Sequence, residues 1–230
     1  MDGYACASHQ RALAAQQAGW FAPEIVAVSQ QTFELDGYRP RGICLPRGVE
    51  TVSQDSHPRP SELSALARLR TIHEGGVQTA GNSCAVVDGA AAALVGRASA
   101  CRDRPLALLR ASAVVGVAPE LMGIGPAPAI RLLLQRSGLS LTQIGRLEVN
   151  EAQAAQVLAV ARELELDSDR LNVQGGSLAL GHPLAASGLR LVLTLARQLR
   201  EHNLRYGIAA ACVGGGQGMA LLIENPAWRG

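Results

Sequence analysis

The stretch from Asn172 to Gly188, N-V-Q-G-G-S-L-A-L-G-H-P-L-A-A-S-G, combines a polar entry, a glycine pair, a short apolar run and one histidine followed by proline. Its glycines permit positive backbone φ angles and let other groups come close. Pro183 biases the residue before it away from helical backbone and stiffens the turn. His182 is therefore expected on tightly turned backbone rather than on a helix face. Ser187 is expected to cap an apolar helix that follows over residues 189–199.

Two interpretations of His182 stay open on these residues alone. A titratable side chain that is held rigidly between glycines is typical of a functional site. A histidine that merely closes a turn fits the same sequence equally well. The choice between them depends on other parts of the chain.

The composition is typical of a globular protein with ample length for a core. Of the 230 residues, 48% are hydrophobic but only 3% are aromatic, so the core should consist of Ala, Leu and Val. All 21 basic residues are arginines, and their dispersion at a net charge of +2 gives no nucleic-acid-binding footprint. No apolar run reaches membrane-spanning length, and the N-terminus does not read as a signal peptide.

The cysteines argue against a disulfide framework and against a zinc site. Their number is odd and no C-x-x-C pair occurs, which fits a reducing cytoplasm best. Nothing in the sequence around three of them, Cys6, Cys44 and Cys101, suggests activation of the thiol. The other two are Cys84 and Cys212.

The first part of the chain is predicted to hold little regular structure after one helix. That helix should cover Asp2 to Ala18 and end at Gly19. The further expectations are a short strand at Glu24–Ser29, loops over Gln30–Pro60, a helix from Ser61 to Arg70 and a turn at Thr79–Asn82.

Strands and helices alternate from Asp88 onward, which predicts a three-layered α/β fold with a largely parallel sheet. Residues 90–95 are expected to form a strand or the start of a helix. Because residues 214–218 make so short a link, the last two strands should be antiparallel neighbours. The expected strands are Leu106–Val117, Arg146–Asn150, Tyr206–Val213 and Met219–Glu224, and the expected helices are Gly125–Ser137, Ala152–Leu166 and Leu189–Arg200.

Three polar residues are expected to meet at one edge of this sheet. Asn150 ends one strand, His182 lies on the turn after the next short strand, and Cys212 ends the following one. Glycines directly after Cys212 expose backbone N–H groups that can hold an oxyanion. Each residue also has a plain structural interpretation: Asn150 as a helix N-cap and Cys212 as a buried strand cysteine. Together they suit acyl transfer or proton abstraction at a thioester.

Five segments of this sequence resemble the thiolase family. They are N-E-A at Asn150, G-G-S-L-A-L-G-H-P-L-A-A-S-G at Gly175, C-V-G-G-G-Q-G at Cys212, T-A-G-N at Thr79 and M-G-I-G-P at Met122. The opening helix with its G-W-F-A-P-E-I-V is similar as well. The resemblance runs nearly end to end. It implies a thiolase-like αβα fold with a mixed, mostly parallel five-stranded sheet, preceded by a partial loop domain.

The resemblance implies a reversible Claisen condensation of acyl-CoA thioesters, with coenzyme A as substrate or product and no tightly bound cofactor or metal. His182 would activate a nucleophilic cysteine and help form the first oxyanion hole, and Asn150 would position the water that completes it. Cys212 would take the α-proton of acetyl-CoA, and the Gly214 N–H would help hold the second oxyanion. The expected contacts to coenzyme A are Arg70, Ala80, Ser83, Cys84, Met122 and Ala152.

The family's nucleophilic cysteine has no counterpart in a matching setting here. The resemblance divides the chain into a partial loop domain (1–86), the last segment of the N-terminal thiolase domain (87–105) and the C-terminal domain (106–230). A split thiolase is therefore expected, in which a second polypeptide carries the nucleophile and two copies of each chain form a heterotetramer; a truncated fragment is the other interpretation.

Several substitutions leave a second function open. Cys84 stands where the family usually has a pantetheine-contacting serine, and Gln153, Gln174 and Ala185 replace a phenylalanine, an asparagine and a glycine. A non-catalytic subunit that binds acyl-CoA or scaffolds a partner is the alternative. The related 3-oxoacyl synthases are disfavoured, because Cys212 supplies a cysteine base in place of that family's histidine.

Overall fold

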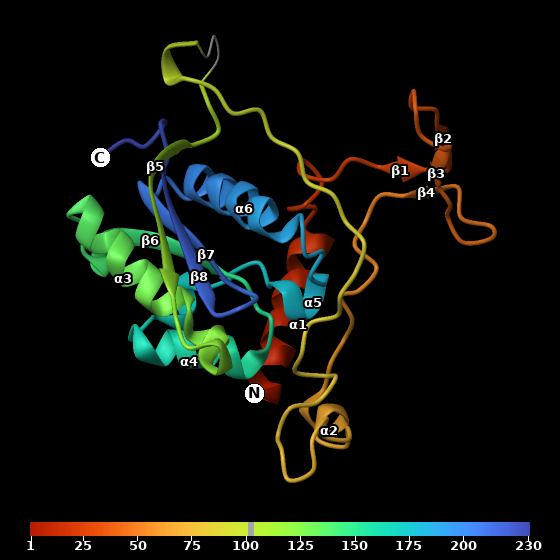
Figure 1. Cartoon of the computed structure of the whole chain (residues 1–230), viewed down its shortest axis with the longest axis horizontal. Coiled ribbons are helices and arrows are strands. Elements are labelled where there is room, and N and C mark those ends of the chain that lie inside the picture. The colour runs from red at the N-terminus through yellow and green to blue at the C-terminus, as the bar shows by residue number, and fades with distance from the viewer. Residues whose placement is uncertain (101–103) are drawn as a thin grey trace.

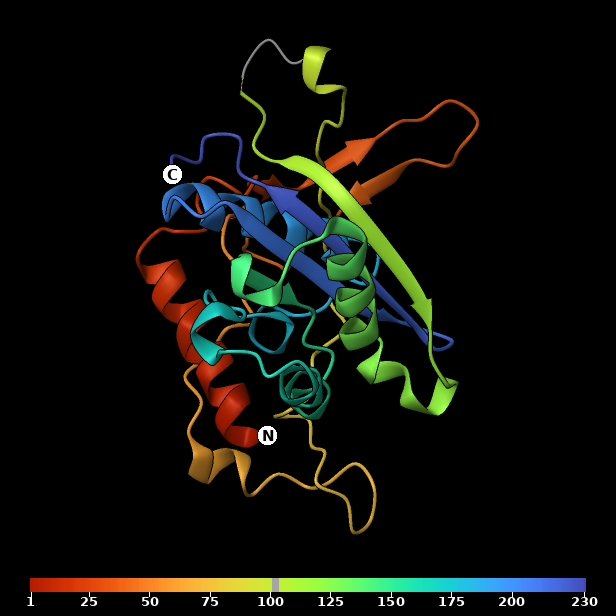
Figure 2. The same cartoon turned by 90° about the vertical axis from the view of Figure 1, so that its left-hand side faces the viewer.

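A mixed β-sheet forms the centre of the chain (Figure 1). The computed structural model describes residues 1–100 and 104–230, so Cys101 lies outside the described residues. The strand order is β5 (Leu108–Gly116), β8 (Gln217–Glu224), β7 (Tyr206–Val213) and β6 (Ile144–Val149). β7 and β8 are antiparallel neighbours, as the sequence predicted, and β5 lies at the outer edge (Figure 2).

Helices cover both faces of this sheet, which confirms the predicted α/β class. α3 (Pro126–Ser137) and α4 (Ala154–Glu163) pack on one face, and α6 (Ser187–Glu201) packs on the other. Successive strand residues face opposite layers, so each strand contributes to both cores. The buried residues include Ile130, Leu133, Val157 and Ile208 in the first core, and Leu191, Leu195, Leu199 and Ile223 in the second.

The prediction of a mostly parallel five-stranded sheet is wrong in its count and in its pairing. Within the described residues the sheet has four strands, and β6 with β7 is its parallel pair. The expected strand before the His182 stretch is reduced to one parallel bridge, Leu171 to Leu147. It ends there because Asn172 turns to a φ of +47°, and its side-chain amide bonds the Val149 N–H and C=O at 2.8 and 2.9 Å.

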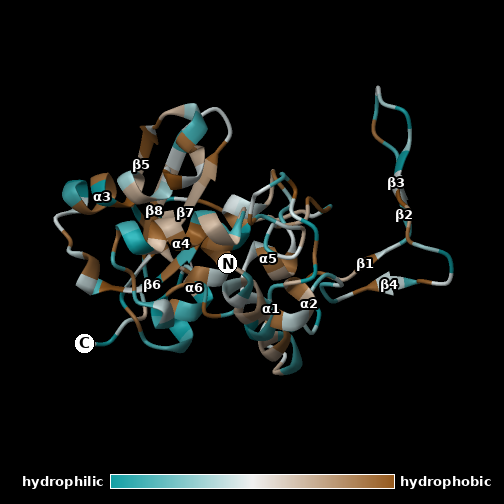
Figure 3. Cartoon of the chain, turned by 90° about the horizontal axis from the view of Figure 1, so that it is seen from below, coloured by the Kyte–Doolittle hydropathy of each residue, from teal (hydrophilic) through white to brown (hydrophobic). Residues whose placement is uncertain are grey.

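In the first hundred residues the opening helix and the turn at Thr79–Asn82 were predicted correctly, whereas the expected strand at residues 24–29 and helix at residues 61–70 were too long. α1 (Asp2–Gln17) forms as expected, and Gly19 follows it at a φ of +70°. α2 covers only Leu63–Leu66, since its N-cap makes no side-chain hydrogen bond and it buries one leucine. An arm extends from the body (Figure 3) and holds β1 (Val28–Ser29), β2 (Gln31–Phe33), β3 (Arg41–Ile43) and β4 (Thr51–Val52).

Residues 87–97 run over the surface of the body as extended chain (Figure 1). The expected strand or helix at residues 90–95 does not form. Leu94 and Val95 are fully or largely exposed, because nothing in the described chain covers this segment.

In the described ranges, no helix is long and apolar enough to cross a membrane. The short helical segments are η1 (Ala98–Ala100), η2 (Pro119–Ile124), η3 (Leu141–Gln143), η4 (Ser168–Arg170) and α5 (Ser177–Leu180).

Candidate active site

His182 lies on tightly turned backbone directly after α5, as the glycines around it predicted. The four residues Ser177–Leu180 directly before Gly181 form the helical turn α5. Gly181 adopts a φ of +89°, and a Cβ there would come within 2.6 Å of the Val87 side chain. The His182 N–H donates to the carbonyl oxygen of Ala85 at 2.8 Å. The residues around 85–87 therefore hold the backbone of His182 in place.

The hydrogen bonds of the His182 ring define its tautomer. Ser187 Oγ donates its proton to the Pro183 carbonyl at 2.9 Å, so we assign it as the acceptor of the His182 Nδ1–H, 2.6 Å away. Nε2 is then unprotonated and lies 3.3 Å from the Asn150 amide nitrogen. Burial, followed by the charge of Arg190, lowers the pKa of His182. A neutral imidazole with an unprotonated Nε2 can accept a proton from a thiol.

The predicted helix cap at Ser187 and the alternative interpretation of Asn150 as a helix N-cap are both wrong. Ser187 lies inside the first turn of α6, whose N-cap is Ala186, and its hydroxyl contacts His182 instead. Asn150 does not cap α4, because Gln153 occupies that N-cap position. Asn150 ends β6, and its N–H donates to the Ala210 carbonyl of β7 at 2.9 Å. Its side chain is thereby free to face His182.

Cys212 lies near the end of β7, the strand beside Asn150. It pairs with Gly218 across the β7–β8 hairpin, whose turn uses Gly215 and Gly216 at φ of +86° and +89°. Burial raises the pKa of the Cys212 thiol. Gly214 is exposed at the start of this turn. A protonated thiol at this position can act as an acid, and it becomes a base once it has given up its proton.

Three of the expected coenzyme A contacts lie together beside this strand end. The Cys84 N–H donates to the Ala152 carbonyl at 3.1 Å, and Ser83 forms a bridge with Gln153. Burial raises the pKa of the Cys84 thiol, and the nearby charge of Cys212 adds to the shift. Ser83, Cys84 and Ala152 therefore lie on paired stretches of backbone.

The remaining expected contacts are less closely grouped. Met122 is half-buried in η2, next to Gly123, which lies against the Gln156 side chain. Gln156 accepts the Ala152 N–H at 3.2 Å, which ties η2 to the N-E-A segment. Arg70 and Ala80 are exposed, on the segment that follows α2.

The burial of the Glu151 carboxylate and its hydrogen bonds were not predicted from the sequence. Its carboxylate is buried, and it accepts hydrogen bonds from Tyr4 at 2.8 Å, Ser8 at 2.7 Å, Asn172 at 3.0 Å and the Leu178 N–H at 3.2 Å. These donors come from α1, the Asn172 turn and α5. An acidic residue directly after an apolar strand was the available signal, but its partners lie far away in sequence.

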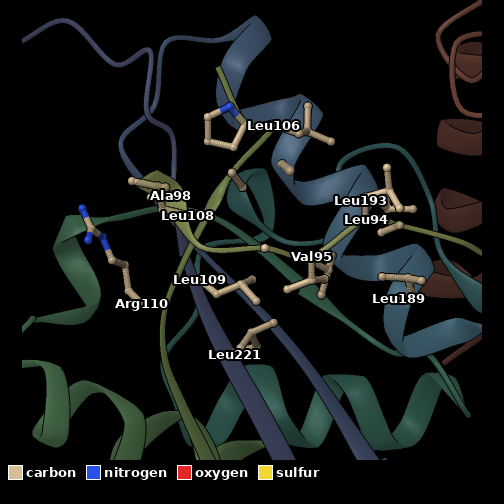
Figure 4. A pocket seen from close by; sticks show the side chains of 16 residues that line it. Leu94, Val95, Ala98, Leu106, Leu108, Leu109, Arg110, Leu189, Leu193 and Leu221 are labelled. Carbon is tan, nitrogen blue, oxygen red and sulfur yellow. The ribbon is translucent and has the colours of Figure 1, made fainter. Parts of the chain in front are cut away.

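An apolar cavity of about 460 Å³ lies apart from His182, Asn150 and Cys212 (Figure 4). It is bounded by the extended chain of residues 87–97, the start of β5 and the outer side of α6. The labelled side chains around it are almost all aliphatic, with Arg110 at one side. Its lining includes Leu94, Val95, Leu106, Leu189, Leu193 and Leu221.

Comparison with known proteins gives one consistent family. Residues 103–225 match the family model described as thiolase, C-terminal domain, and residues 1–99 match thiolase, N-terminal domain. The chain is 46% identical over 231 residues to the beta-ketoadipyl-CoA thiolase of Pseudomonas aeruginosa and 42% identical to the peroxisomal 3-ketoacyl-CoA thiolase B of Rattus norvegicus. These alignments cover 97% and 98% of this chain but 54% and 53% of those proteins.

Solved structures agree with this result. Human mitochondrial 3-ketoacyl-CoA thiolase superposes with a TM-score of 0.84 at 38% identity, covering 98% of this chain and 55% of that chain. A structure of human mitochondrial 3-ketoacyl-CoA thiolase in complex with CoA gives a TM-score of 0.80 at 36% identity, covering 97% and 54%. The chain thus spans about half the length of the relatives it matches.

Proposed function

Because this chain belongs to the thiolase family, we propose that it supplies one part of an active site for reversible acyl transfer between acyl-CoA thioesters and coenzyme A. The observation that carries the proposal is the pairing of His182 Nε2 with the Asn150 amide at 3.3 Å, beside the strand that ends at Cys212. A neutral imidazole, an amide donor and a thiol acid at one sheet edge match the needs of Claisen chemistry.

In the cleavage direction, a nucleophilic thiol gives its proton to His182 Nε2 and attacks the C3 carbonyl of a 3-oxoacyl-CoA. The oxyanion that forms is held beside His182 and Asn150. The C2–C3 bond then breaks, and its electron pair goes to the enolate of acetyl-CoA. That enolate takes a proton from Cys212, while the Gly214 N–H holds its oxygen. The thiol of a coenzyme A molecule then gives its proton to the Cys212 thiolate and attacks the acyl group, and the nucleophile leaves as a thiolate that takes its proton back from His182.

Coenzyme A would lie along the segment that contains Ser83, Cys84 and Ala152. The human relative in complex with CoA supports a CoA site in this fold. Cys84 would contact the pantetheine arm, together with Met122 on η2. Arg70 and Ala80, on the exposed segment after α2, would contact the nucleotide end. Arginine suits the anionic phosphates there.

We also propose that the nucleophilic thiol comes from polypeptide outside these 230 residues. Four cysteines lie in the described ranges: Cys6 is buried on α1 in an apolar cluster with Ala154 and Leu178, and Cys44 is exposed directly after the arm strand β3. Cys84 and Cys212 have the roles given above. The uncovered Leu94 and Val95 and the apolar cavity beside α6 support a second polypeptide segment that packs there. A partner chain, assembled as two copies of each, is the arrangement we propose.

The experiment is complementation in vitro. The purified chain is mixed with the N-terminal half of the Pseudomonas aeruginosa relative, and cleavage of a short 3-oxoacyl-CoA by coenzyme A is followed. The chain alone should be inactive and the mixture active. His182→Ala and Cys212→Ala should each lower kcat by at least about 10²-fold, the scale of losing one key acid, base or oxyanion donor.

Matched controls are His202→Ala and Cys44→Ala, which remove the same side-chain types from exposed positions. Both should keep normal rates. Unchanged turnover in His182→Ala or Cys212→Ala would contradict the catalytic proposal. Tight binding of coenzyme A without turnover in any mixture would favour a scaffolding subunit instead.

A further inference from the structure

The side-chain oxygen of Asn150, on the opposite end of the amide from His182, is bound by one hydroxyl group. Ser177, fully buried at the start of α5, donates its proton to Asn150 Oδ1 at 2.7 Å. This contact fixes which end of the planar amide points to His182, since Oδ1 is engaged and the nitrogen must face Nε2 at 3.3 Å. A flipped amide would present oxygen to that same nitrogen.

Arg190 determines the direction of the Ser177 hydroxyl. Its NH2 group, from the first turns of α6, lies 3.3 Å from Ser177 Oγ. Guanidinium nitrogens only donate hydrogen bonds, so Ser177 accepts from Arg190. The single proton of the hydroxyl is thereby directed to Asn150. One donor–acceptor order therefore runs from Arg190 through Ser177 to the amide.

Arg190 is itself held by a buried carboxylate. Glu148, on β6 and without exposed surface, lies 3.5 Å from Arg190 NH1, and it accepts a hydrogen bond from Gln198 Nε2 at 2.9 Å. Burial raises the pKa of Glu148 to about 7, and the charge of Arg190 opposes that shift. The chain of contacts thus joins β6, α5 and α6 beneath the site.

We propose that Ser177 and Arg190 are positioning residues that orient the Asn150 amide so that its nitrogen, and not its oxygen, faces His182. Neither residue contacts the reacting atoms. Each acts through a directed hydrogen bond, Arg190 on Ser177 and Ser177 on Asn150. The catalytic consequence rests on the function proposed above. The orientation itself is a property of this chain alone.

The first test therefore needs no activity. In chain labelled with ¹⁵N at histidine, the ring-nitrogen shifts of His182 report its tautomer at about pH 8, where histidine is largely neutral. Wild type should carry its proton on Nδ1. In Ser177→Ala and Arg190→Met the amide is free to flip, and its oxygen would draw the proton to Nε2. A population of the Nε2–H form in both variants is expected, and an unchanged tautomer in both overturns the proposal.

The second test uses the completed enzyme of the complementation experiment. Ser177→Ala should lower kcat about 10- to 100-fold, the scale of a misplaced group, with KM within twofold. Ser177→Thr keeps the hydroxyl and should restore most of kcat, and exposed Ser64→Ala should behave as wild type. A loss in KM alone, or an equal loss in Ser177→Thr with native tautomer, overturns the positioning role.

The two failures can be distinguished. If the mixture is inactive with every variant including wild type, the proposed function fails, while the tautomer still decides the positioning of Asn150. If the wild-type mixture is active and the tautomer is insensitive to Ser177 and Arg190, the proposed function stands and this inference fails.

Discussion

The side-chain amide of Asn172 bonds both peptide groups of Val149 and so takes the place of a neighbouring strand at the edge of the sheet. Its nitrogen also donates to Glu151 and lies 3.1 Å from the Tyr4 hydroxyl. Asn172, a buried residue with left-handed backbone, therefore ends the strand pairing and also holds the Glu151 carboxylate next to Asn150 in sequence.

Replacing Asn172 by alanine should be strongly destabilising. The change leaves a buried peptide N–H and C=O without partners and keeps a positive φ that alanine tolerates poorly, which together should lower the unfolding free energy by about 3–4 kcal/mol. Urea denaturation measures this. Asn203→Ala is the matched control, because Asn203 has a φ of +48° but is exposed. It should lose about 1 kcal/mol, and equal losses would contradict the importance of burial.

Gly176→Ala should be destabilising for a reason unrelated to backbone angle. A Cβ at Gly176 would lie 2.3 Å from the Glu151 carboxyl carbon, so the carboxylate and its four hydrogen bonds must move. A loss of about 2–3 kcal/mol is expected, in the range of overpacked buried sites. Gly3→Ala is the control, since its Cβ meets nothing within 4 Å on α1 and alanine favours helix there. A stable Gly176→Ala variant with native thermal unfolding would contradict the contact.

His9 should make the chain less stable as the pH falls. Burial, then the charges of Arg59 and His57, lowers its pKa from 6.5 to about 4. Because the folded value is the lower one, the unfolded state binds the proton first, and stability declines as the pH drops from 6.5 towards 4. The full effect is about 3 kcal/mol by linkage.

The measurement is the unfolding free energy across this range in wild type and in His9→Asn, whose amide can still accept the Arg59 N–H that His9 Nδ1 accepts at 3.3 Å. The variant should show a shallower decline. His202→Asn, at an exposed histidine, should follow the wild-type curve. A wild-type slope in His9→Asn would show that other groups are responsible.

Glu148→Gln should cost far more than Glu163→Gln. The first leaves the half-buried Arg190 facing an uncharged amide in a buried setting, for which about 3 kcal/mol is expected. The second weakens an ion pair with Arg131 that is exposed on both sides, worth at most about 1 kcal/mol. Denaturant unfolding of the two variants and wild type compares them directly. Similar costs would mean that Glu148 is not held by its buried partners.

Elements that bury one face within the chain were predictable from sequence. The period of α3 and α6 and the apolar runs of β7 and β8 determine their local structure and their packing at once. The failures share a cause: residues 90–95, expected as a strand or the start of a helix, find no partner among the described residues, and the strand after α4 yields to the Asn172 amide. Local pattern cannot show where a partner is missing or replaced.

The polar residues Asn150 and His182 could be predicted from the sequence, but the buried charged residues that hold the surrounding segments in place could not. Glycines and strand ends pointed to Asn150 and His182, which the structure brings to 3.3 Å. Glu151 and Arg190 were not predicted, because a charged residue can be identified as buried only when its contact partners are known. The partners of Glu151 include Ser8, 143 residues away, and no local periodicity records such a contact.

The bonds from Tyr4 and Ser8 to Glu151 also impose an order of events during synthesis. α1 leaves the ribosome before Glu151, whose carboxylate accepts hydrogen bonds from its hydroxyl groups and follows 143 residues after Ser8. At usual elongation rates this delay is on the order of ten seconds. For that time the hydroxyl groups of the nascent helix are hydrated, and the docking of α1 onto Glu151 is a late step that closes a loop of 143 residues.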